Sequence, residues 1–124
     1  MSQYFQVGNL ILWNPSRCVA ELFVQTGEAV ANLVDMTSGI GPMNADEYEI
    51  DMDAFVSFVD VAVERYMSSN HAVLRSLLEG FLVAAIVLVG RAGRVVSALH
   101  TPAAPEDPEH LQEKSDALAC TMPR

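Results

Sequence analysis

The polar side chains best placed to do chemistry lie between residues 66 and 79. His71, Arg75 and Glu79 recur every four residues, so a helix would place them on one face. A histidine near a carboxylate can serve as a general base, and an arginine can orient an anionic substrate. Together with Tyr66 they form the candidate ligand-binding site. An intrahelical ion pair between Arg75 and Glu79 is the commoner cause of such spacing, so no catalytic residue is predicted and enzymatic activity stays uncertain.

The acidic segment 46–53 is a second group of candidate ligands, in which carboxylates alternate with apolar residues. Asp51 and Asp53 match the first two ligand positions of a calcium-binding loop, but no glycine follows where such a loop needs one. The alternation is typical of a short strand with Glu47, Glu49 and Asp51 on its exposed side. Asp51 or Asp53 would then cap the next helix. We therefore expect neither a metal nor another cofactor.

Charge and cysteine content limit the partners and the setting. The 124 residues carry a net charge of −9, from sixteen acidic and seven basic side chains. Nucleic acid and anionic membranes are not expected as partners, because no basic cluster is present to neutralise phosphates. Cys18 and Cys120 lie far apart in the sequence, and the first seven residues lack the features of a secretory signal. A reducing, cytoplasmic location is the resulting expectation.

The elements that position these residues begin with strands. Two β-prone runs, residues 4–7 and 10–13, flank Gly8-Asn9 and predict a hairpin. Residues 46–53 offer a third short strand for the same sheet. The glycines and the proline of residues 37–44 predict a loop.

Three helices are predicted from apolar periodicity, over residues 15–35, 53–68 and 71–99, with Asn14 as the cap of the first. Their polar stripes are narrow, and residues 81–89 have no polar side chain at all. This run is about half as long as a membrane span, so no membrane association is expected. Three wide apolar faces in so short a chain indicate a homodimer instead. The residues predicted for its interface are Phe81, Val83, Ile86 and Val87.

The fold class that follows is mainly α, of the α+β type. An N-terminal hairpin, with or without a third short strand, packs on a three-helix core. Residues 1–100 form the single globular domain. Residues 101–124 comprise a proline-rich linker and a short C-terminal helical tail over residues 108–121, with Leu111, Leu118 and Ala117 as its contact face.

Three functions fit these features. The first is a non-enzymatic interaction or assembly protein that self-associates through apolar helix faces. The second is a small-molecule-binding protein or small enzyme of bacterial metabolism, with its pocket near His71 and Arg75. The third is an immunity-type protein whose acidic surface meets a basic partner, a hypothesis that only the net charge supports.

Short motifs spread over most of the chain resemble an uncharacterised family of small actinobacterial cytoplasmic proteins. The resemblance implies a bacterial cytoplasmic setting, but it brings no activity, cofactor or functional residue with it. The motifs are Leu12-Trp13-Asn14-Pro15-Ser16, Gly41-Pro42-Met43, Ser69-Asn70-His71, Leu74-Arg75-Ser76-Leu77, Glu79-Gly80-Phe81 and Met122-Pro123-Arg124.

Overall fold

The chain starts with the hairpin that its sequence predicts. In the computed structural model, which describes residues 2–100 and 106–124, β1 (Tyr4–Val7) and β2 (Leu10–Trp13) pair antiparallel. Gly8 takes a positive φ of 58° in the turn between them, a conformation that glycine adopts without steric cost. The register shifts between Phe5 and Gln6, which allows the neighbouring Leu12 and Trp13 to be buried together.

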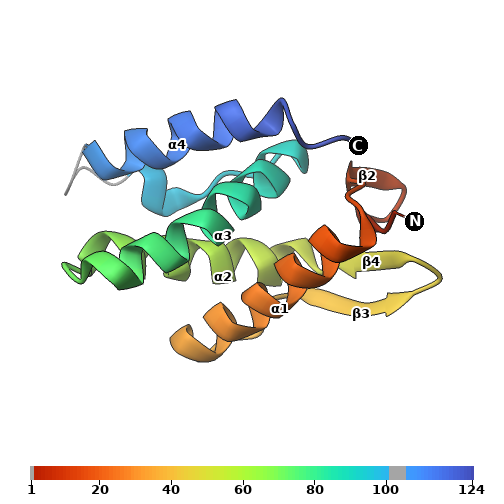
Figure 1. Ribbon diagram of the computed structural model, residues 1–124, viewed down its shortest axis with the longest axis horizontal. Coiled ribbons are helices and arrows are strands. Elements are labelled where there is room, and N and C mark those ends of the chain that lie inside the picture. Colours follow the sequence, from red (N-terminus) through yellow and green to blue (C-terminus); the bar gives the residue numbers. More distant parts are fainter. Residues whose placement is uncertain (1, 101–105) are drawn as a thin grey trace.

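The sheet has four strands, in the order β2-β1-β4-β3 (Figure 1). The acidic segment supplies β4 (Glu47–Ile50), which joins the hairpin by pairing parallel to β1. The prediction of a loop over residues 37–44 is wrong in part, because residues 40–44 form β3 (Ile40–Asn44), which pairs antiparallel with β4. Its proline is tolerated because β3 is an edge strand. Ala45 and Asp46, both at positive φ, form the tight turn that joins β3 to β4.

Helix α1 (Arg17–Val34) begins two residues later than predicted, because its cap is Ser16 and not Asn14. The Ser16 hydroxyl accepts a hydrogen bond from the backbone N–H of Val19, one of the donors that the first turn leaves unpaired. The backbone N–H of Asn14 instead donates to the carbonyl of Pro123, which ties the end of β2 to the C-terminal residues.

Helix α2 (Met52–Ser68) is capped by Asp51, so the strand predicted to reach residue 53 stops at residue 50. Helix α3 (Ala72–Arg91) ends eight residues before the predicted residue 99. Gly93 has a φ of 73°, which stops the helix, and a 3₁₀ turn, η1 (Ser97–His100), follows.

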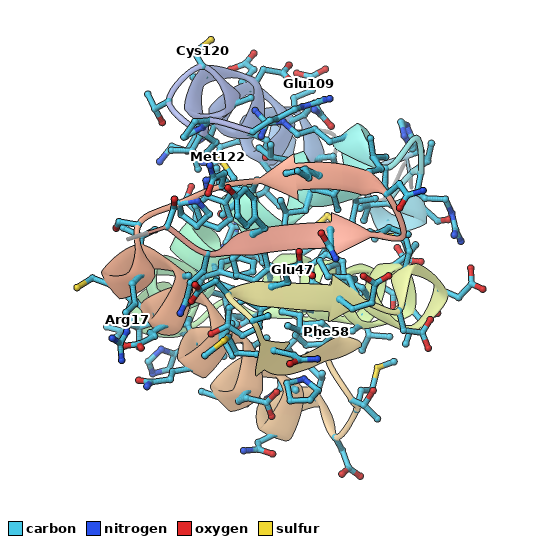
Figure 2. The ribbon with its side chains drawn as sticks, turned by 90° about the vertical axis from the view of Figure 1, so that its right-hand side faces the viewer. Arg17, Glu47, Phe58, Glu109, Cys120 and Met122 are labelled. Carbon is cyan, nitrogen blue, oxygen red and sulfur yellow. The ribbon has the colours of Figure 1, made fainter. Side chains whose placement is uncertain are left out.

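Helix α3 lies at the centre of the helical layer. It packs against α2 and against α4 (Glu106–Ala119), and more lightly against α1 (Figure 1). The sheet closes one end of the helices, and Figure 2 looks onto it with the helices behind. Stacked rings of Phe5, Tyr48 and Trp13 join the sheet to Phe23 on α1, which in turn stacks on Phe81 of α3.

The α+β class is therefore confirmed, while the three-helix core is matched only in part because α4 also packs on α3. Leu111 of α4 is fully buried, and Ser115 rather than Ala117 is buried beside it. Of the predicted linker, residues 101–105 lie outside the described residues.

The apolar run from residue 81 to residue 89 is buried within the chain itself. The accessible surface of the chain is 6753 Å², close to the roughly 6,500 Å² expected for a folded monomer of this mass. The chain thus buries its most apolar segment by its own fold, while several large apolar side chains elsewhere in the described residues, among them Leu22 and Leu77, remain exposed. By length and composition α3 is also the one helix in the described residues that could cross a membrane, a property that central helices of soluble proteins share.

Candidate functional site

The predicted polar site is divided between two structural roles. At the turn between α2 and α3, the guanidinium carbon of Arg75 lies 4.4 Å from the centre of the Tyr66 ring. The Nη1 atom of Arg75 also donates to the carbonyl of Ser69. His71 is exposed and caps α3, since its Nδ1 accepts from the backbone N–H of Leu74 at 3.3 Å. These three side chains stabilise the turn.

Glu79, the fourth predicted ligand-binding residue, interacts with α4 instead. Its Oε1 lies 2.6 Å from Nε2 of His110 and 3.1 Å from Nζ of Lys114. Burial raises the pKa of Glu79, but the hydrogen bonds and charges of Lys114 and His110 outweigh it and hold this pKa below its ordinary value. Glu79 thus fastens α4 to α3, and the structure does not bring all four residues into one site.

The four residues predicted for the dimer interface are core residues of the chain. Phe81, Val83, Ile86 and Val87 are between 4% and 7% exposed. Helix α4 covers the side of α3 that carries Val83, Ile86 and Val87, and the buried hydroxyl of Ser115 donates to the carbonyl of Val83 at 3.0 Å. Phe81 instead stacks on Phe23 of α1. A self-association surface therefore has to be sought on the side of α3 that no other helix of residues 2–100 and 106–124 covers.

That open side carries an apolar groove of about 350 Å³. Its floor is formed by α3, one wall by α1, and the other wall by the residues at the end of α4. Most of the lining is apolar, and none of it is charged. The lining residues are Trp13, Val19, Leu22, Phe23, Thr26, Gly80, Phe81, Ala84, Leu118, Thr121 and Met122.

Two leucines project beside this groove. Leu22 on α1 is 67% exposed and Leu77 on α3 is 71% exposed, the two highest values among the large apolar side chains of the described residues. Val73, Leu77, Gly80 and Ala84 share one face of α3 by their spacing of four, three and four. At Gly80 a Cβ atom would meet nothing within 4 Å. Prominent side chains and an open hollow therefore lie on the same face.

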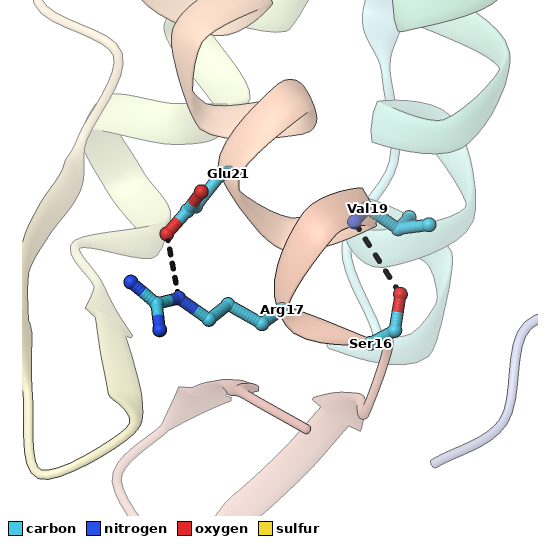
Figure 3. A network of polar contacts seen from close by, with 4 residues as sticks. All are labelled: Ser16, Arg17, Val19 and Glu21. Atoms are coloured by element: carbon cyan, nitrogen blue, oxygen red, sulfur yellow. Dashed lines mark hydrogen bonds and ion pairs between the residues drawn. The ribbon is translucent and has the colours of Figure 1, made fainter. Parts of the chain in front are cut away.

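The polar atoms of the groove already have partners. The Thr26 hydroxyl donates to the carbonyl of Leu22 at 2.7 Å, and the Thr121 hydroxyl donates to the carbonyl of Leu118 at 2.8 Å. Figure 3 shows the ion pair between Arg17 and Glu21, at 2.9 Å, on a different side of α1 from the Val19 side chain. The groove thus suits an apolar occupant, because both hydroxyls already donate their hydrogen bonds to backbone carbonyls.

Arg91 at the end of α3 holds one wall of the groove in place. Its Nη1 donates to the carbonyl of Leu12 at 2.8 Å, and its Nη2 donates to those of Ala119 at 3.0 Å and Met122 at 2.8 Å. Burial, together with the nearby charge of Arg124, lowers the pKa of Arg91. One guanidinium therefore joins β2, α3 and the residues after α4.

The acidic segment has structural partners. Glu47 accepts from the side-chain amide of Gln6 at 3.1 Å, and Glu49 accepts from the backbone N–H of Gly8 at 2.7 Å. Asp51 caps α2. Within residues 2–100 and 106–124, no group of three or more His, Cys, Asp or Glu side chains is placed to hold a metal ion.

Fold and groove define a small α+β protein whose described residues form a mixed four-stranded sheet and four helices, with an uncovered apolar face on α1 and α3. A family model described as a family of unknown function (DUF6086) matches residues 1–124, and the chain belongs to this family. No curated protein and no solved structure matches the chain.

Sequence reasoning missed the groove, although one signal for it was present. The spacing of Val73, Leu77, Gly80 and Ala84 describes an apolar face that contains two small residues. What the sequence could not show is that α1, α2 and α4 leave this face open.

Proposed function

We propose that the protein is a non-enzymatic interaction protein that self-associates through one apolar face. This apolar face consists of Val19 and Leu22 on α1, Val73 and Leu77 on α3, and the groove between the two helices. The observation that carries the proposal is the pair of highly exposed leucines beside an uncharged hollow. The largest apolar patch on a protein surface is often an interaction surface.

The amount of exposed surface indicates how strong such self-association can be. The exposed parts of these four side chains come to roughly 400 Å² per copy, within the range of the largest patches on monomers. Two copies would bury on the order of 1,000 Å² once the groove lining is included, which is typical of weak or transient complexes. We therefore expect a dimer with a Kd of about 10 to 100 μM, well above the nanomolar range of tight complexes.

The chemistry of the groove supports binding over catalysis. Ligand pockets of enzymes combine an apolar body with a few convergent polar groups, whereas both hydroxyls in this groove donate to backbone carbonyls three or four residues earlier in the chain. Tyr66, His71, Arg75 and Glu79 all have structural partners outside the groove.

Sedimentation velocity from 2 to 200 μM tests the proposal. The wild type should show a mass that rises with concentration toward twice that of the chain. Leu77→Asp should stay monomeric, because losing about 1.5–3 kcal/mol of apolar burial at each of two symmetric positions weakens the dimer at least a hundredfold. Val95→Asp is the matched control, since Val95 is 60% exposed but does not line this groove. A wild type that stays monomeric at 200 μM would refute the proposal.

A further inference from the structure

The apolar face has the shape of a surface that can pair with itself. A two-fold dimer uses the same patch on both copies, so that patch must contain both the projections and the hollows that receive them. Leu77 projects, and Gly80 and Ala84, one and two turns further along α3, form a hollow with open space above Gly80. Both parts of a complementary contact are thus present on one copy.

Charge limits the surfaces at which a second copy can approach. Each chain carries a net charge of −9, so two copies repel one another over most of their surfaces. The groove lining contains no charged residue, and the Arg17–Glu21 ion pair lies on another side of α1 (Figure 3). Two copies can therefore approach at this face without bringing like charges into contact.

Resting on the self-association proposed above, we infer that the groove receives Leu77 of a second copy, in an antiparallel two-fold crossing of the two α3 helices centred near Gly80. In this arrangement Leu77 of each copy lies over Ala84 of the other, and the two Gly80 residues face one another. A parallel crossing would set Leu77 against Leu77 and leave both grooves without an occupant. Antiparallel helices also bring opposite ends of the helix dipoles together.

The small side chains on the floor make this approach possible. Distances between helix axes range from 8 to 10 Å according to the side chains at the crossing, and glycine permits the shorter distance. Gly80 lies in the middle of α3 and has an ordinary helical backbone, so nothing in the fold of the single chain requires glycine there. Close contact with a second helix gives this residue a role.

Disulfide trapping distinguishes the crossing modes. The background is the full chain with Cys18→Ser and Cys120→Ser, since both cysteines are free and exposed. Gly80→Cys, Val73→Cys and Val95→Cys are then oxidised separately at 100 μM. In the antiparallel crossing the two copies of residue 80 come within disulfide distance, whereas the two copies of residue 73 are about 21 Å apart along the helices.

The expected result is a rapid covalent dimer for Gly80→Cys and only slow background linking for Val73→Cys and Val95→Cys. Rapid linking through both residue 73 and residue 80 would indicate a parallel crossing and overturn the inference. A dimer in sedimentation that does not link rapidly through residue 80 would also overturn it, while leaving the proposed function intact. A monomeric wild type would overturn both.

Filling the hollow gives a second test that needs no oxidation. Gly80→Leu adds a side chain where the single chain has open space, so the monomer should fold normally. Its dimer should weaken at least tenfold in sedimentation, because Leu77 of the partner copy loses its place. Unchanged dimerisation of a folded Gly80→Leu variant would contradict the crossing at residue 80.

Discussion

Replacing Arg91 by alanine should destabilise the whole fold, although this side chain is only half-buried. Its guanidinium donates to three backbone carbonyls, those of Leu12, Ala119 and Met122, at 2.8 to 3.0 Å. These acceptors lie on β2 and on the residues that end α4 and follow it. Removing the donor therefore releases the C-terminal segment from both the sheet and α3.

The expected loss follows from the kind of hydrogen bond. A hydrogen bond to a charged group contributes about 1.5–3 kcal/mol, and water can partly replace this donor at a half-buried site. We therefore expect Arg91→Ala to lower the free energy of unfolding by roughly 2–4 kcal/mol. Arg91→Lys should lose more than half as much, because one ammonium cannot reproduce the planar fork that reaches three acceptors.

Urea unfolding followed by circular dichroism measures this loss, with Arg94→Ala as the control. Arg94 pairs with the highly exposed Asp53 at 2.8 Å, and exposed ion pairs contribute less than about 1 kcal/mol. Hydrogen exchange should show the amides of α4 opening first in Arg91→Ala. If Arg91→Ala costs no more than Arg94→Ala, the three hydrogen bonds do not hold the C-terminal segment and the reasoning is refuted.

Three further changes have expected outcomes. Gly39→Ala should cost about 3 kcal/mol in a thermal melt, because φ is 78° and the new Cβ would lie 2.7 Å from the backbone nitrogen of Phe55; an unchanged melting temperature would contradict this. Glu79→Gln should destabilise the docking of α4 at pH 7 and make no difference in acid. The reason is that a carboxyl with a lowered pKa stabilises the fold above its ordinary pKa of 4.5 and loses that effect as the pH falls through the folded value. Hydrogen exchange of α4 at pH 7 and pH 3 measures the difference, and an equal effect at both values would count against it. Raising NaCl from 20 to 500 mM should tighten the dimer in sedimentation, because salt screens the repulsion between chains of charge −9; a weaker dimer in salt would indicate an ionic interface instead.

The parts of the fold that local signals encode were predictable from the sequence. Gly8-Asn9 between two β-prone runs gives the hairpin, and Asp51 was one of two aspartates expected to cap α2. Strand β3 was not predictable in this way. Its Gly-Pro pair is typical of a loop, and it forms a strand only because β4 lies alongside to pair with it.

The cap of α1 shows how a distant contact decides a local choice. Asn14 and Ser16 are both good capping residues. The backbone N–H of Asn14 donates to Pro123, more than a hundred residues further along the chain, while the Ser16 hydroxyl accepts from Val19. No pattern near residue 14 contains this information.

The groove shows a further limit of reading a helix from its composition. Residues 81–89 of α3 have the highest apolar content, and composition alone therefore favours them as an interface. The same property makes them the best residues to bury, and α1, α2 and α4 bury them. Leu77, one turn before this run, remains exposed because none of the helices that the structure describes packs over Gly80. In such a protein, a binding face should therefore be sought on the side of a helix that the neighbouring helices leave uncovered. Apolar side chains are fewer there, but they are accessible to a partner.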